Sequence, residues 1–447
     1  MRVFRKKTVL AFICILLGIL IVSCDDGSGS SDKMSKSEML EDFDYLMNIL
    51  EKNYPGFETF ERLNGFDWRD KKNIYREAVS DVKSDKEFFE LMFTVFGYEL
   101  GYLFHAGIMS PSFYNEHCDA FESFAAEFPD YPQLFAPWVD ILQNEDVKKK
   151  YEYWASLLNV ESKYGSRSAK KSYPVYYGCK DTKAMPSTSG LTCEVLEPGK
   201  IAYIKCPTFA AQKTDDLKTV LDFYSKNGVK DFESVIIDLR GNGGGDDYYG
   251  LTVLMDPLTE NLDDTSFYIT WKDNELFKKF YDPMFKLPFS VAEDIDNQRI
   301  VEELSYIDIA DLPSGLDYPD EISANHKYAA QIKYYLNSSP GNPIGFTGDI
   351  YVLVDEYVYS ASETFTMLAK ASGWATIVGT RTGGDGVGFT PVIVTLPNSK
   401  LIYRFSNFMS LNPDGTCNEE VGTIPDVQIG SKENALDKAL EIINSAK

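Results

Sequence analysis

The chain has 447 residues, of which 44% are apolar and 25% are charged. This length allows two or three domains, or one large domain with appendages, and the composition excludes disordered and fibrous proteins. The formal net charge of −24, from 44 basic and 68 acidic residues, argues against nucleic acid as a partner, because phosphate binding needs a basic surface.

The first residues predict a targeting segment. A basic start is followed by an almost unbroken apolar stretch over residues 8–23, and the small residue Ser23 directly precedes Cys24. The pattern resembles a bacterial lipoprotein signal, in which Cys24 becomes the lipidated N-terminal residue. The alternative is an uncleaved membrane anchor, but the apolar run is short for a span of about 20 residues. We therefore expect residues 1–24 to be a signal peptide and residues 25–34 a polar, flexible tether, with the remaining chain outside the cytoplasm and lipid-anchored to the membrane of a bacterial cell envelope.

Cysteine and histidine are sparse and do not form a metal-binding pattern. The chain has seven cysteines and three histidines, with neither a CxxC pair nor an HExxH motif. We therefore expect no zinc site, whether structural or catalytic.

Residues 35–172 predict a helical N-terminal domain. Their first apolar side chains recur at the three- and four-residue spacing of an amphipathic helix: Met39, Phe43, Leu46, Met47 and Leu50. A Tyr-Pro-Gly sequence at Pro55 ends this helix. Residues 68–82 and 86–102 predict two more helices, and residues 111–172 predict a further helical layer.

Residues 173–447 predict an α/β core. Helices are expected over residues 215–226 and 360–372. Strands are expected before, between and after them: residues 195–204 (two short strands with a turn at Gly199), 235–239, 350–354, 376–378, 392–396 and 401–405. Such alternation favours a partly parallel sheet. Residues 256–343 form a long insertion with mixed signals.

A glycine run follows the predicted strand 235–239. Its sequence, Arg-Gly-Asn-Gly-Gly-Gly over residues 240–245, exposes backbone N–H groups, because glycine tolerates the required dihedral angles and lets a ligand approach closely. Such a nest binds anions and could hold a developing oxyanion. A phosphate loop and a plain turn are the alternatives, but no Gly-Lys-Ser/Thr sequence follows, which argues against a Walker-type loop.

A serine stands at the turn between the predicted strand 350–354 and the helix that follows. Ser360 and Glu363 match a capping box, so Ser360 could serve only as the N-cap of the helix. A serine in this place is also well set to be a nucleophile, because its hydroxyl projects from the sheet edge and the helix N-terminus supplies a positive field and N–H groups.

A third segment, residues 412–427, by itself indicates a turn, two acidic residues and a strand. Taken in order, DLRGNGGG at 238–245, SASE at 360–363 and PDG…E…G…PD at 413–426 resemble the C-terminal processing (tail-specific) and tricorn-like serine protease family. The resemblance covers roughly residues 173–429. It implies a crotonase-like ββα spiral in the core, hydrolysis of peptide bonds in protein or peptide substrates, and no cofactor.

The resemblance also implies roles for single residues. The first serine of SASE is the nucleophile in that family, which assigns Ser360 here. The backbone N–H of Ala361 and of one glycine in residues 243–245, with Gly244 preferred, would form the oxyanion hole.

The position of the general base departs from the commonest pattern of the family. Many members carry a lysine after the nucleophile helix, but Asp385 stands at that position here, so a Ser–Lys dyad is not expected and Asp385 is assigned no part in proton transfer. The tricorn-like branch instead uses a histidine from the N-terminal part and a late glutamate. These correspond to His105 and Glu419, with Glu420 as the near alternative.

Chemistry agrees with a histidine base, because imidazole titrates near neutral pH. His117 lies in a polar, surface-like stretch and His326 in the insertion, so His105 is preferred, with a buried structural histidine as the alternative. Its sequence neighbours, Phe104 and Ala106, offer no group that would orient the imidazole.

The predicted function is a serine endopeptidase of the cell envelope that works through an acyl-enzyme. One alternative is a catalytically degraded lipoprotein of the same fold that binds peptides or other ligands. A second alternative is an esterase or peptidase that acts on cell-wall components. No segment resembles the carboxylate-binding loop of a PDZ domain.

Overall fold

A computed structural model describes residues 33–127, 129–158, 190–210, 213–286, 299–337, 341, 343–430 and 432–445. The predicted signal peptide and nearly all of the predicted tether lie outside these residues. Within the described ranges, no helix combines the length and apolar character needed to cross a membrane. Residues 35–447 pack as one unit.

The helical region begins at a well-formed cap. Helix α2 (Lys36–Asn53) starts at Ser35, whose hydroxyl accepts from Glu38 N while the Glu38 side chain accepts from Ser35 N. This capping box fixes the first turn, and the predicted apolar stripe of α2 is buried. The remaining elements of the region follow in chain order: α3 (Phe57–Asn64), η1 (Trp68–Lys71), α4 (Lys72–Asp81), α5 (Asp85–Phe93), η2 (Thr94–Tyr98), η3 (Leu103–His105), α6 (Pro111–Glu127), η4 (Pro132–Leu134), α7 (Ala136–Leu142) and α8 (Glu145–Leu157).

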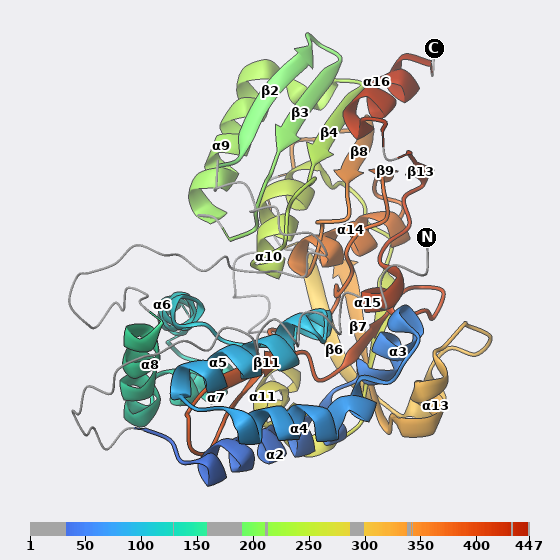
Figure 1. The fold of residues 1–447 in the computed structure, drawn as a ribbon. Helices are drawn as coiled ribbons and strands as arrows, with labels where there is room; N and C mark the ends of the chain where they lie inside the picture. The colour runs from blue at the N-terminus through green and yellow to red at the C-terminus, as the bar shows by residue number, and fades with distance from the viewer. Residues whose placement is uncertain are drawn as a thin grey trace. The chain divides into compact units, whose positions relative to one another are not determined.

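A six-stranded sheet forms the centre of the α/β core, in the order β13-β9-β8-β4-β3-β2 (Figure 1). All neighbouring pairs are parallel except β2 with β3. The strands are β2 (Thr192–Glu197), β3 (Ile201–Lys205), β4 (Ser234–Asp238), β8 (Asp349–Val354), β9 (Thr376–Gly379) and β13 (Val427–Gln428). The predicted α/β core with a partly parallel sheet is confirmed.

Burial explains why these segments form the centre. Every residue of β4 is buried, and so are five of the six residues of β8, as near-continuous apolar strands of a parallel sheet require. Helix α16 (Ala435–Ser445) packs its apolar side on one face of the sheet through Ala435, Ala439 and Ile443. The helices α9 (Lys213–Asn227) and α14 (Ala361–Ala371) also lie close to the predicted ranges.

The insertion forms a sheet of its own. Strands β5 (Thr265–Trp271), β7 (Tyr328–Leu336) and β6 (Ile300–Ile307) pair antiparallel, and β12 (Met409–Leu411) adds to β5. Because β12 comes from the end of the core, this pairing fastens the insertion to it. Two short elements lead into the insertion, α10 (Asp247–Tyr249) and η6 (Gly250–Met255). Within it lie η7 (Asp256–Leu258), α11 (Asn274–Phe285), η8 (Ile309–Asp311) and α13 (Asp320–Asn325).

A third, small sheet links the helical region to the core. The predicted strands β10 (Val392–Thr395) and β11 (Ile402–Phe405) pair with each other rather than with the central sheet, and β1 (Gly107–Ile108) joins the other edge of β11. The register sets Gly107 opposite Arg404. Since β1 begins two residues after His105, this pairing brings the predicted base to the α/β core.

Candidate active site

Asn242 joins the glycine run to the start of α14. Its carbonyl accepts from Ser362 Oγ at 2.6 Å and from Tyr359 N at 3.3 Å. Its side-chain oxygen accepts from Gly244 N at 2.9 Å, and its amide nitrogen donates to Cys206 O at 3.0 Å. With every polar atom of its side chain bonded and no surface exposed, Asn242 holds the run rigidly beside the helix.

The run comes into close contact with Ser360. A Cβ placed on Gly244 would lie 2.7 Å from Tyr359 O, 2.9 Å from Ser360 Cβ and 3.0 Å from Ala361 N. The structure thus brings the three predicted positions Gly244, Ser360 and Ala361 together. The N–H of Gly244 is already used by Asn242 Oδ1, so the N–H groups of Gly243 and Gly245 are the other donors that this run offers to an oxyanion.

Ser360 occupies the N-cap position of α14 but does not cap it. Its side chain accepts no hydrogen bond from the helix, and its backbone is in an unusual conformation with φ 58° and ψ −128°. Glu363, the partner that a capping box would need, instead accepts from Asn418 Nδ2 at 2.8 Å and from Thr423 Oγ1 at 2.7 Å. The interpretation of Ser360 as a mere helix cap is therefore wrong. The hydroxyl of Ser362, the other serine of the motif, donates a hydrogen bond to the carbonyl of Asn242.

His105 lies beside the residue that precedes Ser360. Its ring centroid is 5.0 Å from that of Tyr359, at an interplanar angle of 50°. Ser406 N donates to Phe104 O at 2.7 Å and so extends the β1–β11 contact to the histidine. Positive φ angles at Phe104 and His105 turn the chain sharply enough to aim the imidazole at the core.

The carboxylate that contacts the imidazole is Asp385. Its Oδ2 lies in direct contact with His105 Nδ1, and the side chains of Asp385 and His105 are 3% and 6% exposed, so water does not compete. Ser406 Oγ lies 3.3 Å from Nδ1 and 3.4 Å from Asp385 Oδ2. Sequence reasoning missed Asp385 because it stands at the position where the family resemblance would place a lysine. One signal in the sequence could have indicated Asp385. The neighbours of His105 offer no group that would orient its imidazole, so a carboxylate from elsewhere in the chain was needed.

Glu419 lies in the same cluster, through Tyr359. The hydroxyl of Tyr359 is 3.1 Å from Asp385 Oδ2 and 3.2 Å from Glu419 Oε2. The alternative, Glu420, is an ion-pair partner of Arg62 on α3, at 2.8 and 3.1 Å from Nε. Both glutamates belong to the single turn α15 (Asn418–Val421), but only Glu419 reaches the tyrosine.

Electrostatics favour a neutral imidazole at the site. Burial lowers the pKa of His105, the Asp385 carboxylate opposes this, and the charge of Arg404 adds to the lowering. A neutral imidazole can accept a proton at neutral pH. Burial raises the pKa of Tyr359 well above its ordinary value, so its hydroxyl stays protonated and donates.

The other two histidines serve the fold. His117, expected in a surface-like stretch, has its Nδ1 3.1 Å from Phe113 O, and burial lowers its pKa to about 3. His326 has its Nδ1 2.6 Å from Thr270 Oγ1, and burial likewise lowers its pKa to about 3.

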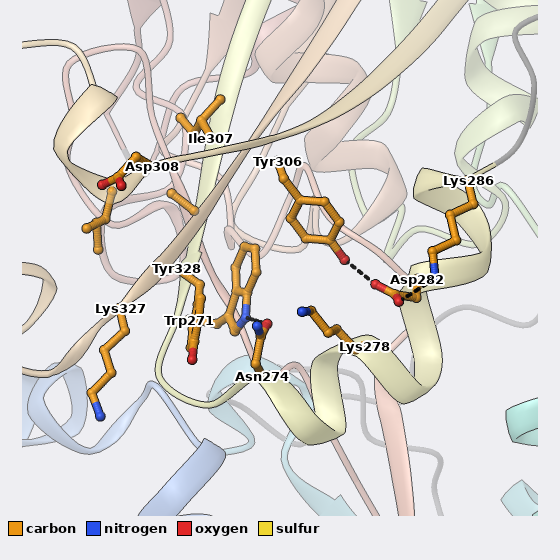
Figure 2. A pocket seen from close by; sticks show the side chains of 12 residues that line it. Trp271, Asn274, Lys278, Asp282, Lys286, Tyr306, Ile307, Asp308, Lys327 and Tyr328 are labelled. Atoms are coloured by element: carbon orange, nitrogen blue, oxygen red, sulfur yellow. Dashed lines mark hydrogen bonds and ion pairs between the residues drawn. The ribbon is translucent and has the colours of Figure 1, made fainter.

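Two further features lie apart from this cluster. In the part of the chain that the structure describes, no group of three or more His, Cys, Asp or Glu side chains is placed to hold a metal ion. Figure 2 shows a pocket between α11 and the strands of the insertion, with Trp271, Lys278 and Tyr306 among its lining. None of the residues of the Ser360 cluster lines it.

Comparison of the sequence with protein families finds one match. The profile of peptidase family S41 matches residues 200–429, which is 230 of the 447 residues. The match contains the glycine run, Ser360 and Glu419, and it confirms the resemblance that the three motifs indicate. A search of curated proteins finds no match.

Solved structures with a similar arrangement are distant in sequence. A candidate peptidase from Parabacteroides merdae is 18% identical, with 91% of this chain and 96% of that chain covered and a TM-score of 0.49. Mature CPAF in complex with lactacystin is 12% identical, with 92% and 97% covered and a TM-score of 0.49. The photosystem II D1 C-terminal processing protease is 18% identical, with 55% and 50% covered and a TM-score of 0.32.

Proposed function

Because the chain belongs to peptidase family S41 and is therefore a serine-type peptidase, we propose that it is an endopeptidase of the cell envelope with Ser360 as its nucleophile. His105 is the general base, Glu419 supports the base, and protein or peptide chains are the substrates. No cofactor takes part in this scheme.

In the proposed reaction the Ser360 hydroxyl attacks the carbonyl carbon of the scissile peptide bond while His105 takes the hydroxyl proton. The backbone N–H of Ala361, at the first turn of α14, and an N–H of the glycine run stabilise the oxyanion that develops. His105 then gives the proton to the leaving amine, and an acyl-enzyme remains on Ser360. Water, activated by the same imidazole, releases the acid and restores the serine.

The observation that carries this proposal is the unused hydroxyl of Ser360 at a strained N-cap. A positive φ at a non-glycine residue is costly and persists mainly where function requires it. The Ser360 side chain does not cap the helix, and its Cβ lies against Gly244, 2.9 Å from where a Cβ on that glycine would stand. The ring of His105 lies beside that of Tyr359, the residue that precedes Ser360.

The envelope location rests on the sequence before residue 25. A basic start, an apolar stretch and a small residue before Cys24 support lipidation of Cys24 and a membrane anchor at the N-terminus. Substrates would then be proteins or peptides outside the cytoplasm.

One observation favours the alternative of a peptide- or ligand-binding lipoprotein that has lost catalysis. Asn242 Oδ1 occupies the N–H of Gly244, which was the preferred second oxyanion donor. Loss of one such donor costs roughly 10²- to 10³-fold in rate.

Labelling with a serine-reactive fluorophosphonate distinguishes an active serine endopeptidase from a binding lipoprotein that has lost catalysis. We expect the wild-type protein to be labelled at Ser360 and to cleave unstructured peptides, and Ser360→Ala to lose both properties. Ser372→Ala removes a hydroxyl at the opposite end of the same helix, where it bonds Leu368 O at 2.6 Å, and should retain labelling and cleavage. A folded wild-type protein that binds peptides but neither reacts nor cleaves would establish the binding lipoprotein instead.

A further inference from the structure

We propose that Asp385, rather than Glu419, is the positioning residue that orients His105 for catalysis. This inference rests on the proposed function, in which His105 is the base. It replaces the expectation that Asp385 takes no part in proton transfer, and it gives Glu419 a place one step further from the imidazole.

The contact fixes the tautomer of the imidazole. A carboxylate can only accept a hydrogen bond, so the proton of the neutral ring must lie on His105 Nδ1, where Asp385 meets it. Nε2 is then the bare nitrogen that can take a proton from Ser360. Ser406 Oγ, 3.3 Å from Nδ1, flanks the same contact and holds the ring from the β11 side.

The residues before and after Asp385 in its loop are hydrogen-bonded, one to Ser360 and the other to Asn418, the residue before Glu419. Ser360 N donates to Gly384 O at 3.1 Å. Gly386 N donates to Asn418 Oδ1 at 2.8 Å. Because the residues on both sides of Asp385 are held in this way, its carboxylate has a fixed place relative to Ser360.

Backbone strain falls on the same three residues. In the described ranges, seven non-glycine residues have positive φ, and Ser360 (58°), His105 (55°) and Asp385 (55°) are among them. Each such conformation is energetically unfavourable and is kept only where surrounding contacts impose it. Strain at three positions far apart in sequence that meet at one point indicates that they act as one unit.

Glu419 acts on this unit through a shared hydroxyl. Tyr359 has a single hydroxyl proton, so it can donate fully to only one of Asp385 and Glu419 at a time. Glu419 thus adjusts the hydrogen bonding of Asp385. Of Asp385 and Glu419, only Asp385 contacts the imidazole directly and so sets its direction.

The charges that face His105 come from several elements. Asp385, on the loop after β9, raises the pKa of the imidazole, while Arg404 on β11 lowers it. Glu419 on α15 faces it through Tyr359, and His117 on α6 couples weakly to it. Removing the charge of Asp385 should therefore lower the pKa of His105, and it should destabilise the imidazolium that forms during attack by Ser360.

Nuclear magnetic resonance titration of ¹⁵N-labelled histidine tests this directly, because the chain has three histidines and His105→Gln assigns the signal. All variants carry Ser360→Ala, so the titration does not depend on turnover. We expect Asp385→Asn to lower the pKa of His105 by about one unit or more, and by more than Glu419→Gln does. The matched control Asp42→Asn changes a carboxylate that is also buried and accepts from Asn398 N and Ser399 N, and it should leave the His105 titration unchanged.

With Ser360 restored, Asp385→Asn should reduce kcat by roughly 10⁴-fold with little change in KM. The inference is overturned if Asp385→Asn shifts the His105 titration no more than Glu419→Gln does, or if it leaves kcat within tenfold of the wild type. If Asp385→Asn does not fold, the wild-type ¹⁵N shifts decide, since a neutral ring protonated on Nε2 contradicts the proposal and one protonated on Nδ1 supports it. Failure of the proposed function would appear separately, as absence of cleavage and labelling in the protein with Ser360 intact.

Discussion

Ser362 and Asn242, 120 residues apart in sequence, are joined by a hydrogen bond of 2.6 Å from the serine hydroxyl to the asparagine carbonyl. Both residues are fully buried, so the bond lies inside the core and water does not replace it. It sets how closely the glycine run approaches the start of α14. The spacing between the two segments is therefore fixed, and an added side chain in the contact cannot be absorbed by sliding one past the other.

Gly244→Ala should abolish hydrolysis while the fold survives. The new Cβ would lie 2.7 Å from Tyr359 O and 2.9 Å from Ser360 Cβ, closer than van der Waals contact allows. The run or the serine must then move, and displacement of about 1 Å at a reacting group costs roughly 10²-fold or more in rate. Initial rates of peptide cleavage and the rate of fluorophosphonate labelling measure the loss.

The matched control is Gly241→Ala in the same run. Gly241 also has positive φ (83°), against 101° for Gly244, but nothing lies within 4 Å of the position that a Cβ would take on Gly241. Both changes therefore strain the backbone, at a cost of about 1 kcal/mol. Only Gly244→Ala adds a clash. Equal activity losses in the two variants would show that backbone strain alone is responsible and that the contact with Ser360 is unimportant.

The fold was largely predictable because its signals are local. The strands and helices that were predicted for the core begin and end within three residues of the predicted positions, since buried parallel strands such as β4 and β8 are continuous apolar runs. The insertion gave mixed signals because its antiparallel strands are only partly buried, as in β6. Its pairing with β12, a segment of three residues, carries no sequence pattern of its own.

The candidate site was predictable only where its motifs are contiguous. Ser360 and the glycine run lie in sequence patterns, and their proximity follows from the parallel pairing of β4 and β8. The approach of His105 depends on β1, a strand of two residues that periodicity cannot detect. Asp385 and His105 make their contact with a positive φ at both residues, and a positive φ cannot be predicted from these residue types.

Arg62 connects the helical region to α15 and should matter for both stability and activity. Its guanidinium bonds Glu321 on α13 at 2.7 and 2.8 Å and Glu420 at 2.8 and 3.1 Å. Arg62→Ala would leave Glu321, whose side chain is 1% exposed, without its cation. Because Arg62 itself is 37% exposed, we expect a loss of about 2 kcal/mol in the free energy of unfolding, below the roughly 3 to 5 kcal/mol typical of a fully buried pair.

Urea denaturation measures this change, and Arg76→Ala is its control. Arg76 pairs with Asp44, and each of these side chains is 46% exposed, so removing it should leave the unfolding midpoint unaltered. Arg62→Ala should also lower kcat, because α15 carries Glu419 next to Glu420. A stability loss in Arg76→Ala as large as that in Arg62→Ala would contradict the argument from burial.

The lipid anchor is tested at Cys24. Cys24→Ser should leave the precursor unprocessed or release the protein from membranes, because only cysteine in this position can accept the lipid. Fractionation of cells that express the full chain, with mass spectrometry of the N-terminus, measures both effects. Cys193→Ser removes a half-buried thiol of the core and should remain membrane-bound and lipidated. Membrane association that persists in Cys24→Ser with the apolar stretch intact would favour the uncleaved anchor.

The pH dependence of cleavage should report His105. Burial holds the folded pKa of His105 below its ordinary value of 6.5, so the imidazole is neutral, and able to accept a proton, over the whole range above that lowered pKa. Activity should therefore be constant around pH 7 and fall as the pH drops through a value below 6.5, with a single proton taken up. Measurements of kcat/KM between pH 4 and 9 check this. A profile that rises only at alkaline pH would indicate a lysine base and contradict the role of His105.

The last prediction concerns how the losses at Ser360 and His105 combine. Ser360→Ala should abolish turnover by several orders of magnitude, and its free energy of unfolding should stay close to that of the wild type, because the hydroxyl does not cap α14. An N-cap serine would instead cost about 1 kcal/mol on replacement by alanine.

His105→Ala should cost nearly as much activity as Ser360→Ala, and the double variant should cost little more than either. A nucleophile and its base act as one unit, so once one is removed the other has no proton transfer left to perform. Residual cleavage in all three variants is measured against the wild type under the same conditions, with circular dichroism to verify folding. Losses that multiply, so that the double variant falls below Ser360→Ala by the full factor seen in His105→Ala, would mean that His105 supports the fold of the site rather than the chemistry at Ser360.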